Sequence, residues 1–203
     1  MLDNKWMLVY LRTMRTKDDE KKAALFEATV KLVNEIGFVS SSVSKIAKEA
    51  KVSPATIYVY YKNKEDLLVS TYIDIKRNLS EAVLNNFDNK LPIRDILRNV
   101  WFNMFKYISN NLEYFKFAEQ FSNSPYSSLV NKEAVEQYFD PVINVLQRGI
   151  EQKIIKNVNL DILVAFMFYP ITVLANPRLC QNFELNEENI ETAFTLAWDA
   201  IKL

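Results

Sequence analysis

The chain has 203 residues, 49% of them hydrophobic, which suits one large domain or two small ones and permits a sizeable core. It has no histidine and one cysteine, so an intrachain disulfide and a cysteine metal cluster are excluded and the commonest general base is missing. Only 2 glycines and 6 prolines interrupt the chain, which favours long helices over many turns. The sequence also lacks a G-x-S-x-G motif and a phosphate-binding loop. We therefore expect an all-α protein that is not an enzyme and needs no metal or cofactor.

Charge is distributed unevenly, although the net charge is zero. Residues 1–64 contain 12 Lys and Arg against 7 Asp and Glu, whereas residues 65–203 contain 13 against 18. Between Ser41 and Lys64, five lysines stand against Glu49 alone. A local basic patch of this kind favours an anionic partner, and an ordinary solvated helix face is the alternative interpretation.

Residues 1–15 are interpreted as an N-terminal extension, and Met14 is a plausible second start. The apolar run in this segment, residues 6–11, is shorter than the roughly 7–15 residues of a signal-peptide core and too short to span a bilayer. The lack of disulfides also fits a reducing compartment. These features predict a cytoplasmic protein without a membrane partner.

Helical spacing and end signals predict the first two helices. Apolar residues recur at helical spacing over residues 17–36, and Gly37 follows as a stop. The three serines at 40–42 supply N-cap candidates for a second helix of about two turns. In that helix, apolar residues recur from Val43 to Ala50 at i, i+3, i+4 and i+7.

A third short helix begins at Pro54, because Ser53 is a favourable N-cap and a proline at the first helical position loses no hydrogen bond. It must end before Asn63, which caps the next helix together with Asp66 three residues later. Packing must hold so short a helix, with Ile57 facing inward. The outward-facing residues are Ala55, Thr56, Val59 and Tyr60. Two short helices joined by a tight turn predict a helix-turn-helix, and a helical hairpin that binds nothing is the alternative.

A resemblance to a known family rests on the stretch G-F-x-x-S-S-V-x-x-I-A-x-x-A-x-V-S-x-x-T-I-Y-x-Y-Y-x-N-K-E-x-L, from Gly37 to Leu67. It resembles the DNA-binding head of the tetracycline-repressor (TetR) family over about residues 20–70, with agreement across three helix boundaries. Lys51 and Ala55 stand where the family usually or frequently has glycine, and Tyr61 stands where phenylalanine is usual. The resemblance implies that the third helix enters the major groove of DNA while the second crosses the backbone.

The predicted DNA-binding residues are Ser42, Lys45, Lys51, Ser53, Ala55, Thr56, Tyr58, Val59, Tyr60 and Lys64. The resemblance implies phosphate contacts at Ser42, Ser53, Tyr58, Tyr60 and Lys64. The outer face of the third helix would meet the bases, where hydroxyl and methyl groups offer a hydrogen bond and a contact with a thymine methyl. The lysines before it would add charge. For Tyr58, partial packing in the core is the alternative interpretation.

Further helices are predicted over residues 63–86, 92–109, 111–122, 127–153, 159–176 and 187–202, with Pro141 bending or splitting the fourth of these. Together with the head they give three parts: an extension at 1–15, a helix-turn-helix domain at 16–62, and a helical domain for effector binding and dimerisation at 63–203.

The last two helices predict a dimer. Residues 162–175 are apolar all round apart from Thr172, and the helix after them is apolar on more than one face. A two-fold four-helix bundle with a second copy is the simplest way to cover such faces, and the resemblance implies the same. The predicted interface residues are Phe168, Ile171, Ala193, Ala197, Trp198 and Ile201.

Large aromatic residues crowd the middle of the chain, where they are either ordinary core or the lining of an apolar pocket for a small effector, as the family implies. The predicted lining residues are Tyr72, Ile75, Leu79, Trp101, Phe105, Phe121, Tyr138 and Phe166.

The sequence as a whole predicts a dimeric, ligand-responsive transcriptional repressor that binds a pseudo-palindromic DNA operator and is released by a small apolar effector. The alternative is a DNA-binding regulator or architectural protein without a small-molecule effector.

Overall fold

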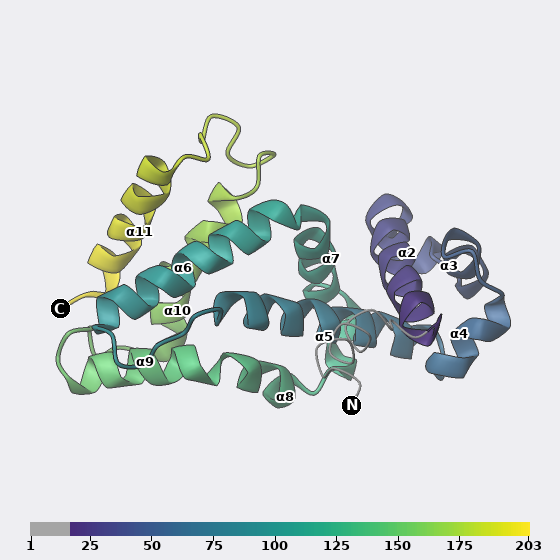
Figure 1. Ribbon diagram of the computed structural model, residues 1–203, viewed down its shortest axis with the longest axis horizontal. Helices are drawn as coiled ribbons and strands as arrows, with labels where there is room; N and C mark the ends of the chain where they lie inside the picture. Colours follow the sequence, from purple (N-terminus) through teal and green to yellow (C-terminus); the bar gives the residue numbers. More distant parts are fainter. Residues whose placement is uncertain (1–16) are drawn as a thin grey trace, which may run out of the picture. The chain divides into compact units, whose positions relative to one another are not determined.

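The computed structural model describes residues 17–203, which form an all-α fold (Figure 1). The described residues divide into two compact units. The first contains the residues up to Tyr72 together with Glu119–Ser127, and the second contains Ile73–Ala118 and Ser128–Leu203. The sequence placed the boundary after residue 62, so the first unit is larger than the predicted head and includes a segment from far along the chain.

The first unit is built from α2 (Lys17–Ser40), α3 (Val43–Glu49), α4 (Pro54–Tyr60) and the first part of α5 (Lys64–Val83). Each short helix begins where the sequence predicts. The Ser42 hydroxyl accepts from the Lys45 amide at 3.3 Å, and the Ser53 hydroxyl accepts from the Thr56 amide at 3.2 Å. These caps satisfy amides that have no partner within the helix, so they fix where α3 and α4 start.

The start of α5 is fixed by a reciprocal pair. The Asn63 side chain accepts from the Asp66 amide at 2.7 Å, and the Asp66 carboxylate accepts from the Lys62 amide at 2.8 Å. The end of α2 is fixed by Gly37, whose φ of 77° and ψ of 168° interrupt the helix before its last residues. The Ser41 hydroxyl donates to the Gly37 carbonyl at 2.7 Å, which satisfies a carbonyl released by that interruption.

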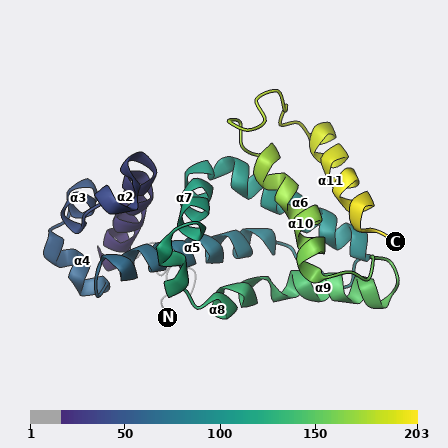
Figure 2. The same ribbon diagram turned by 180° about the vertical axis from the view of Figure 1, so that it is seen from behind.

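The core of the first unit joins α2, α3, α4 and the first turn of α5 (Figure 2). Its buried residues are Leu25, Ala28, Ile46, Ala47, Ala50, Ile57 and Leu67. The segment Glu119–Ser127 adds an aromatic cluster to this unit. The Phe121 ring stacks on Tyr72 with centroids 4.5 Å apart, and Phe38 contacts both Phe121 and Tyr126, with centroids at 6.1 and 5.4 Å.

The second unit contains the rest of α5, α6 (Ile93–Asn110), most of α7 (Leu112–Ser122), α8 (Lys132–Glu136), α9 (Asp140–Glu151), α10 (Leu160–Leu174) and α11 (Glu187–Ile201). Helix α10 packs against α11, α6 and α9. The centre of its core is Trp101, which is fully buried and donates its indole N–H to the Met167 carbonyl at 2.7 Å. A buried tryptophan needs such a partner, so this bond fixes α6 against α10.

The predicted helix over residues 127–153 is replaced by four elements. A 3₁₀ turn (Pro125–Leu129) precedes α8, a second one (Gln137–Phe139) follows it, and α9 then carries Pro141 in its first turn. A proline is favourable in the first turn of a helix, where its missing N–H costs no helical hydrogen bond, so Pro141 marks the start of α9. Among residues 17–203, no helix combines the length and the apolar character needed to cross a membrane.

Candidate functional site

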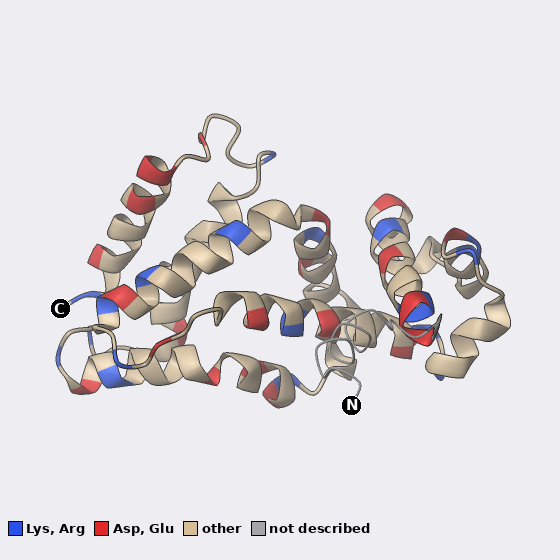
Figure 3. Cartoon of the chain, in the orientation of Figure 1, with Lys and Arg blue, Asp and Glu red and all other residues tan. Residues whose placement is uncertain are grey.

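The outer face of α4 is the most exposed apolar surface of the first unit's short helices. Val59 is 74% exposed and Tyr58 is 59% exposed. Ile57, which precedes them in the sequence, is fully buried in the core. Ala55 is exposed and Thr56 is half-buried. No residue of α4 carries a charge, and basic residues lie on the neighbouring α3 (Figure 3). The alternative that Tyr58 packs in the core does not fit its exposure.

The Thr56 hydroxyl has a hydrogen-bond partner at the N-terminus of α4. This oxygen lies 2.9 Å from the Ser53 hydroxyl, which also caps the helix. The two side chains therefore hold one another, whereas Val59 on the same helix is 74% exposed.

Tyr60 does not face solvent as the sequence predicted. It is half-buried, and its hydroxyl donates to the Asp18 carboxylate at 2.7 Å. The hydrogen bond to Asp18 raises the pKa of Tyr60 above its usual value. The ammonium of Lys22 lies 5.5 Å from the centre of the same ring. Tyr60 therefore ties the end of α4 to the start of α2.

Lys51 has the left-handed backbone that a glycine would favour, with φ at 56°. It lies in the turn between α3 and α4, where its amide donates to the Lys48 carbonyl at 3.1 Å. Its side chain is exposed. A non-glycine residue in this region costs about 1 kcal/mol or slightly more, so this turn is strained.

The lysines of the head differ in what they contact. The Lys45 ammonium donates to the Ser40 carbonyl at 3.1 Å, and the Lys64 ammonium donates to the Phe38 carbonyl at 2.5 Å. Glu49 pairs with Lys31 of α2 at 2.6 Å, and this bond raises the pKa of Lys31. The one acid of the basic stretch is therefore already paired within the head, and its charge does not offset the lysines around it.

The eight predicted pocket residues do not form one cavity lining. Ile75, Leu79, Trp101, Phe105 and Phe121 are buried in close packing, Tyr72 and Tyr138 are half-buried, and Phe166 is exposed. Tyr72 and Phe121 stack in the first unit, whereas the other six belong to the second. One small recess of the second unit is lined instead by Val83, Asn85, Asn86, Phe87, Leu91 and Asn103, together with their neighbours.

The predicted dimer-interface residues mostly face the interior of their own chain. Phe168, Ile171, Ala197, Trp198 and Ile201 are buried in the core of the second unit, and Ala193 is half-buried against it. The opposite face of α10 is the uncovered one. It exposes Ile162, Phe166, Tyr169 and Val173, at i, i+4, i+7 and i+11. Phe166, predicted as a pocket residue, therefore belongs to this outer stripe. Leu196 of α11 is 68% exposed.

Sequence reasoning missed Lys76. This half-buried lysine of α5 holds its ammonium 5.4 Å from the centre of the Phe139 ring. Burial lowers its pKa below the usual value. From the sequence, a lysine within a helix is interpreted as part of a solvated face. The one signal against this interpretation was its position next to Ile75, which is buried.

Comparison with known proteins gives two family matches. The family described as bacterial regulatory proteins, tetR family, matches residues 25–71. The family described as tetracyclin repressor-like, C-terminal domain, matches residues 92–202, more than half of the chain. The chain therefore belongs to the TetR family of DNA-binding transcriptional regulators, which are not enzymes.

Individual relatives agree with this. A TetR family transcription regulator from Marinobacter aquaeolei VT8 has a similar structure, with a TM-score of 0.86 and 37% identity, over 93% of this chain and 99% of that one. The fatty acid metabolism regulator protein of Bacillus subtilis is 31% identical over 148 residues, which cover 71% of this chain and 75% of the relative. The B. subtilis regulator FadR in complex with stearoyl-CoA shares the fold, with a TM-score of 0.67 and 21% identity over 86% and 95% of the two chains.

Proposed function

We propose that this regulator is a dimeric, effector-responsive repressor that reads a pseudo-palindromic operator through α4. The observation that carries the proposal is the outer face of α4, where Val59 and Tyr58 are exposed on a helix anchored by the fully buried Ile57. An uncharged, small-to-medium face of this kind suits the major groove, where valine methyls contact thymine methyls. Operator binding would place the protein in the cytoplasm of its cell.

Phosphate contacts would position α4 in the groove. Ser42, Ser53 and Tyr58 offer hydroxyls around it, and the lysines of the head supply positive charge. Tyr60 offers its hydroxyl only by exchanging the Asp18 carboxylate for a phosphate, since one proton serves one bond. Ala55 and Thr56 would flank Val59 at the bases, with Lys45, Lys51 and Lys64 adding charge along the edge of the site.

The partner that would pair the two heads is a second copy of the chain, seated on the apolar stripe of α10. Four exposed apolar side chains in one row, with Leu196 on the adjacent helix, are more than scattered surface residues. Helices α10 and α11 already pack on one another, so two copies would form a four-helix bundle. This assignment replaces the buried residues that the sequence indicated.

The effector would enter the second unit, whose core is rich in aromatic rings. The ring cluster around Trp101 and Phe105 is closed in this structure, so a ligand must open it. The relative from B. subtilis is named for fatty acid metabolism, and the same fold holds stearoyl-CoA in FadR. A molecule with a long apolar chain is therefore the effector class that we propose.

A regulator without a small-molecule effector is the second candidate, and the closed ring cluster favours it. The two candidates share the DNA-binding half of the proposal and differ in whether any ligand changes operator affinity.

Selection from random oligonucleotides with the purified protein tests the DNA-binding half. We expect enrichment of a pseudo-palindrome whose half-sites lie about one helical turn or slightly more apart. A selection at moderate salt that enriches no sequence would contradict the proposal. The enriched operator then serves to screen ligands, because release by a ligand separates the two candidates.

A further inference from the structure

The effector unit contains a cation whose charge is not balanced by an acid. Lys76 lies on the part of α5 that belongs to the second unit, and in the described part of the chain no carboxylate or hydrogen-bond acceptor contacts its ammonium. Two arginines of this unit, by contrast, are paired with acids. Arg77, the next residue, pairs with Asp74, and Arg98 of α6 binds Glu191 of α11 at 2.7 Å.

The surroundings of Lys76 are unfavourable for a bare charge. The side chain is half-buried, and burial alone lowers the pKa of its ammonium. The face of the Phe139 ring, 5.4 Å away, offsets part of that cost through its negative electrostatic potential. A ring cannot replace the hydrogen bonds that the three N–H groups of an ammonium make in water, so the site remains incomplete.

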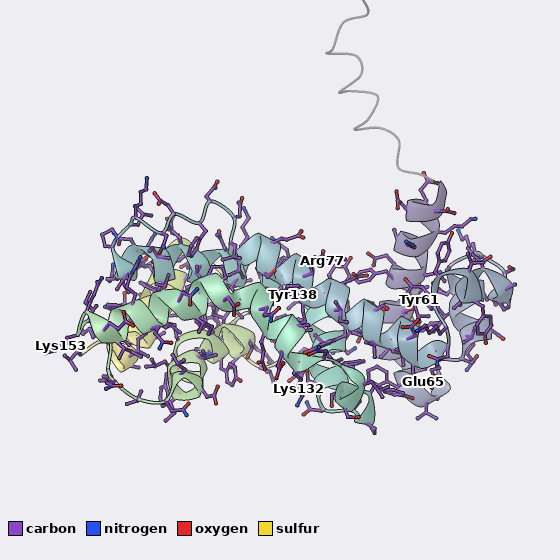
Figure 4. The ribbon with its side chains drawn as sticks, turned by 90° about the horizontal axis from the view of Figure 1, so that it is seen from below. Tyr61, Glu65, Arg77, Lys132, Tyr138 and Lys153 are labelled. Atoms are coloured by element: carbon purple, nitrogen blue, oxygen red, sulfur yellow. The ribbon has the colours of Figure 1, made fainter. Side chains whose placement is uncertain are left out.

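The groups next to this cation are apolar. Ile75 and Leu79 of the same helix are buried, and Phe139 packs against the main core of the unit. Phe139 follows Tyr138 in the 3₁₀ turn, and Figure 4 shows Tyr138 from this turn, Arg77 from α5 and Lys132 from α8. An anion that binds here would therefore meet the Lys76 ammonium beside the apolar Phe139 ring.

We propose that Lys76 and Phe139 form the headgroup site of an amphipathic effector, which carries an anionic oxygen group on a long apolar chain. The proposal rests on the effector-responsive function proposed above and makes it more specific. It also revises the sequence-based expectation of a small apolar effector, which did not take Lys76 into account. The anion would supply the missing hydrogen-bond acceptors, while the chain would displace rings of the adjacent core.

Titration calorimetry with three probes of equal chain length tests this site: palmitate and palmitoyl-CoA, each below its micelle concentration, and hexadecanol, below its solubility limit. Wild-type protein should bind at least one anionic probe more tightly than the neutral alcohol. Lys76→Met should weaken that anionic probe by roughly ten- to hundredfold, the usual value of a charge-assisted hydrogen bond, and leave hexadecanol unchanged. Lys76→Arg should retain most of the preference. Lys132→Met, which removes an exposed lysine of α8, is the matched control and should change nothing.

The comparison between the two anionic probes identifies the group that Lys76 holds. A loss confined to palmitate indicates a carboxylate, and a loss confined to palmitoyl-CoA indicates the phosphates of the coenzyme. Without ligand, Lys76→Met should raise the melting temperature, because it removes a partly desolvated charge. That gain distinguishes a ligand-binding role from a structural one.

Three results would overturn the proposal: no binding of any probe, binding of hexadecanol as tight as that of both anionic probes, or equal losses for all probes in Lys76→Met. Operator binding by Lys76→Met without ligand should equal that of the wild type. A failure of the wild-type protein to bind any operator would instead contradict the proposed function. The calorimetric result would be interpreted separately, because it measures ligand binding and not DNA binding.

Discussion

The two units differ in how closely their function follows the local sequence. In the first unit, three consecutive helix starts are set by Ser42, Ser53 and Asn63, each bonded to an amide three residues ahead. The outer face of α4 then follows from the buried position of one residue, Ile57. In the second unit, the face that a helix buries depends on distant partners, as when Trp101 binds the carbonyl of Met167. The proposed DNA recognition is therefore encoded over short stretches, and the proposed response to a ligand depends on packing.

The largest expected effect concerns the outer stripe of α10. Phe166→Glu places a charge at the centre of this stripe and should prevent a second copy from packing there. Because two linked heads bind far more tightly than one, operator affinity should fall by about 100-fold or more. Analytical ultracentrifugation should show a folded monomer.

Two variants control this experiment. Leu129→Glu changes another exposed apolar residue, outside α10 and α11, and should leave the dimer intact. Trp198→Glu puts a charge into the core and should unfold the second unit rather than yield a folded monomer. A Phe166→Glu protein that still sediments as a dimer would place the interface elsewhere.

The next largest effect concerns base recognition. Val59→Ala removes two methyl groups from a valine that is 74% exposed on α4 and should relax the preference at one base-pair position, with a loss of about 1–2 kcal/mol for the best operator. Selection from random oligonucleotides measures this directly. Val39→Ala, a change at a 90% exposed valine outside α4, should leave the preference unchanged. Equal preferences for wild type and Val59→Ala would show that α4 does not read the bases.

The cap of α4 should contribute about 1 kcal/mol to its stability. Ser53→Ala removes the oxygen that accepts from the Thr56 amide and that lies beside the Thr56 hydroxyl. Amide hydrogen exchange should then be faster over residues 54–60. Ser44→Ala, at an exposed position inside α3, is the matched control and should have little effect. Unchanged protection of α4 in Ser53→Ala would mean that packing alone holds the helix.

The turn before α4 should become more stable when its strain is removed. Lys51→Gly replaces a residue at φ 56° with one that adopts this conformation freely, and should stabilise the first unit by up to about 1 kcal/mol. It also removes one positive charge, so operator affinity should depend less steeply on salt. A lower melting temperature would show that the turn carries no strain at this residue.

The smallest effect is expected in the second unit. Among the described residues, the Tyr107 hydroxyl is a buried polar group without a hydrogen-bond partner, and burial raises its pKa, with a smaller contribution from Glu81. Tyr107→Phe removes it and should be neutral or stabilising by less than about 1 kcal/mol. Tyr138→Phe, at a half-buried position, provides the comparison. Clear destabilisation by Tyr107→Phe alone would mean that a water or ligand binds the hydroxyl.

The sequence predicted the helices well because their ends carry local signals. Pro54, Gly37 and the caps place the helix ends of the first unit within a few residues of those observed, and Lys51, which replaces a usual glycine of the family, has the left-handed backbone of a glycine. Tyr60 was the exception. Its outward orientation followed from helical spacing, but Asp18, 42 residues away in the chain, provides a partner that draws it against α2.

The sites of the second unit were harder to predict, for a physical reason. Helix α10 is apolar on all sides, so periodicity cannot tell Phe166, which is exposed, from Phe168, which is buried. Only the packing of α6, α9 and α11 decides between them. The same applies to the rings, because Tyr72 and Phe121 stack in the first unit while Trp101 and Phe105 pack in the second.

The most direct test of the whole account is whether the two units are energetically coupled. Helices α5 and α7 each contribute residues to both units, which is why we expect a ligand in one to affect DNA binding by the other. The measurement is titration calorimetry with palmitate or palmitoyl-CoA, whichever binds more tightly. It is run once with the protein alone and once with saturating operator. The account predicts that operator lowers the affinity for the probe by about 5–150-fold. The probe should lower the affinity for operator by the same factor. Identical probe affinities with and without operator would contradict it.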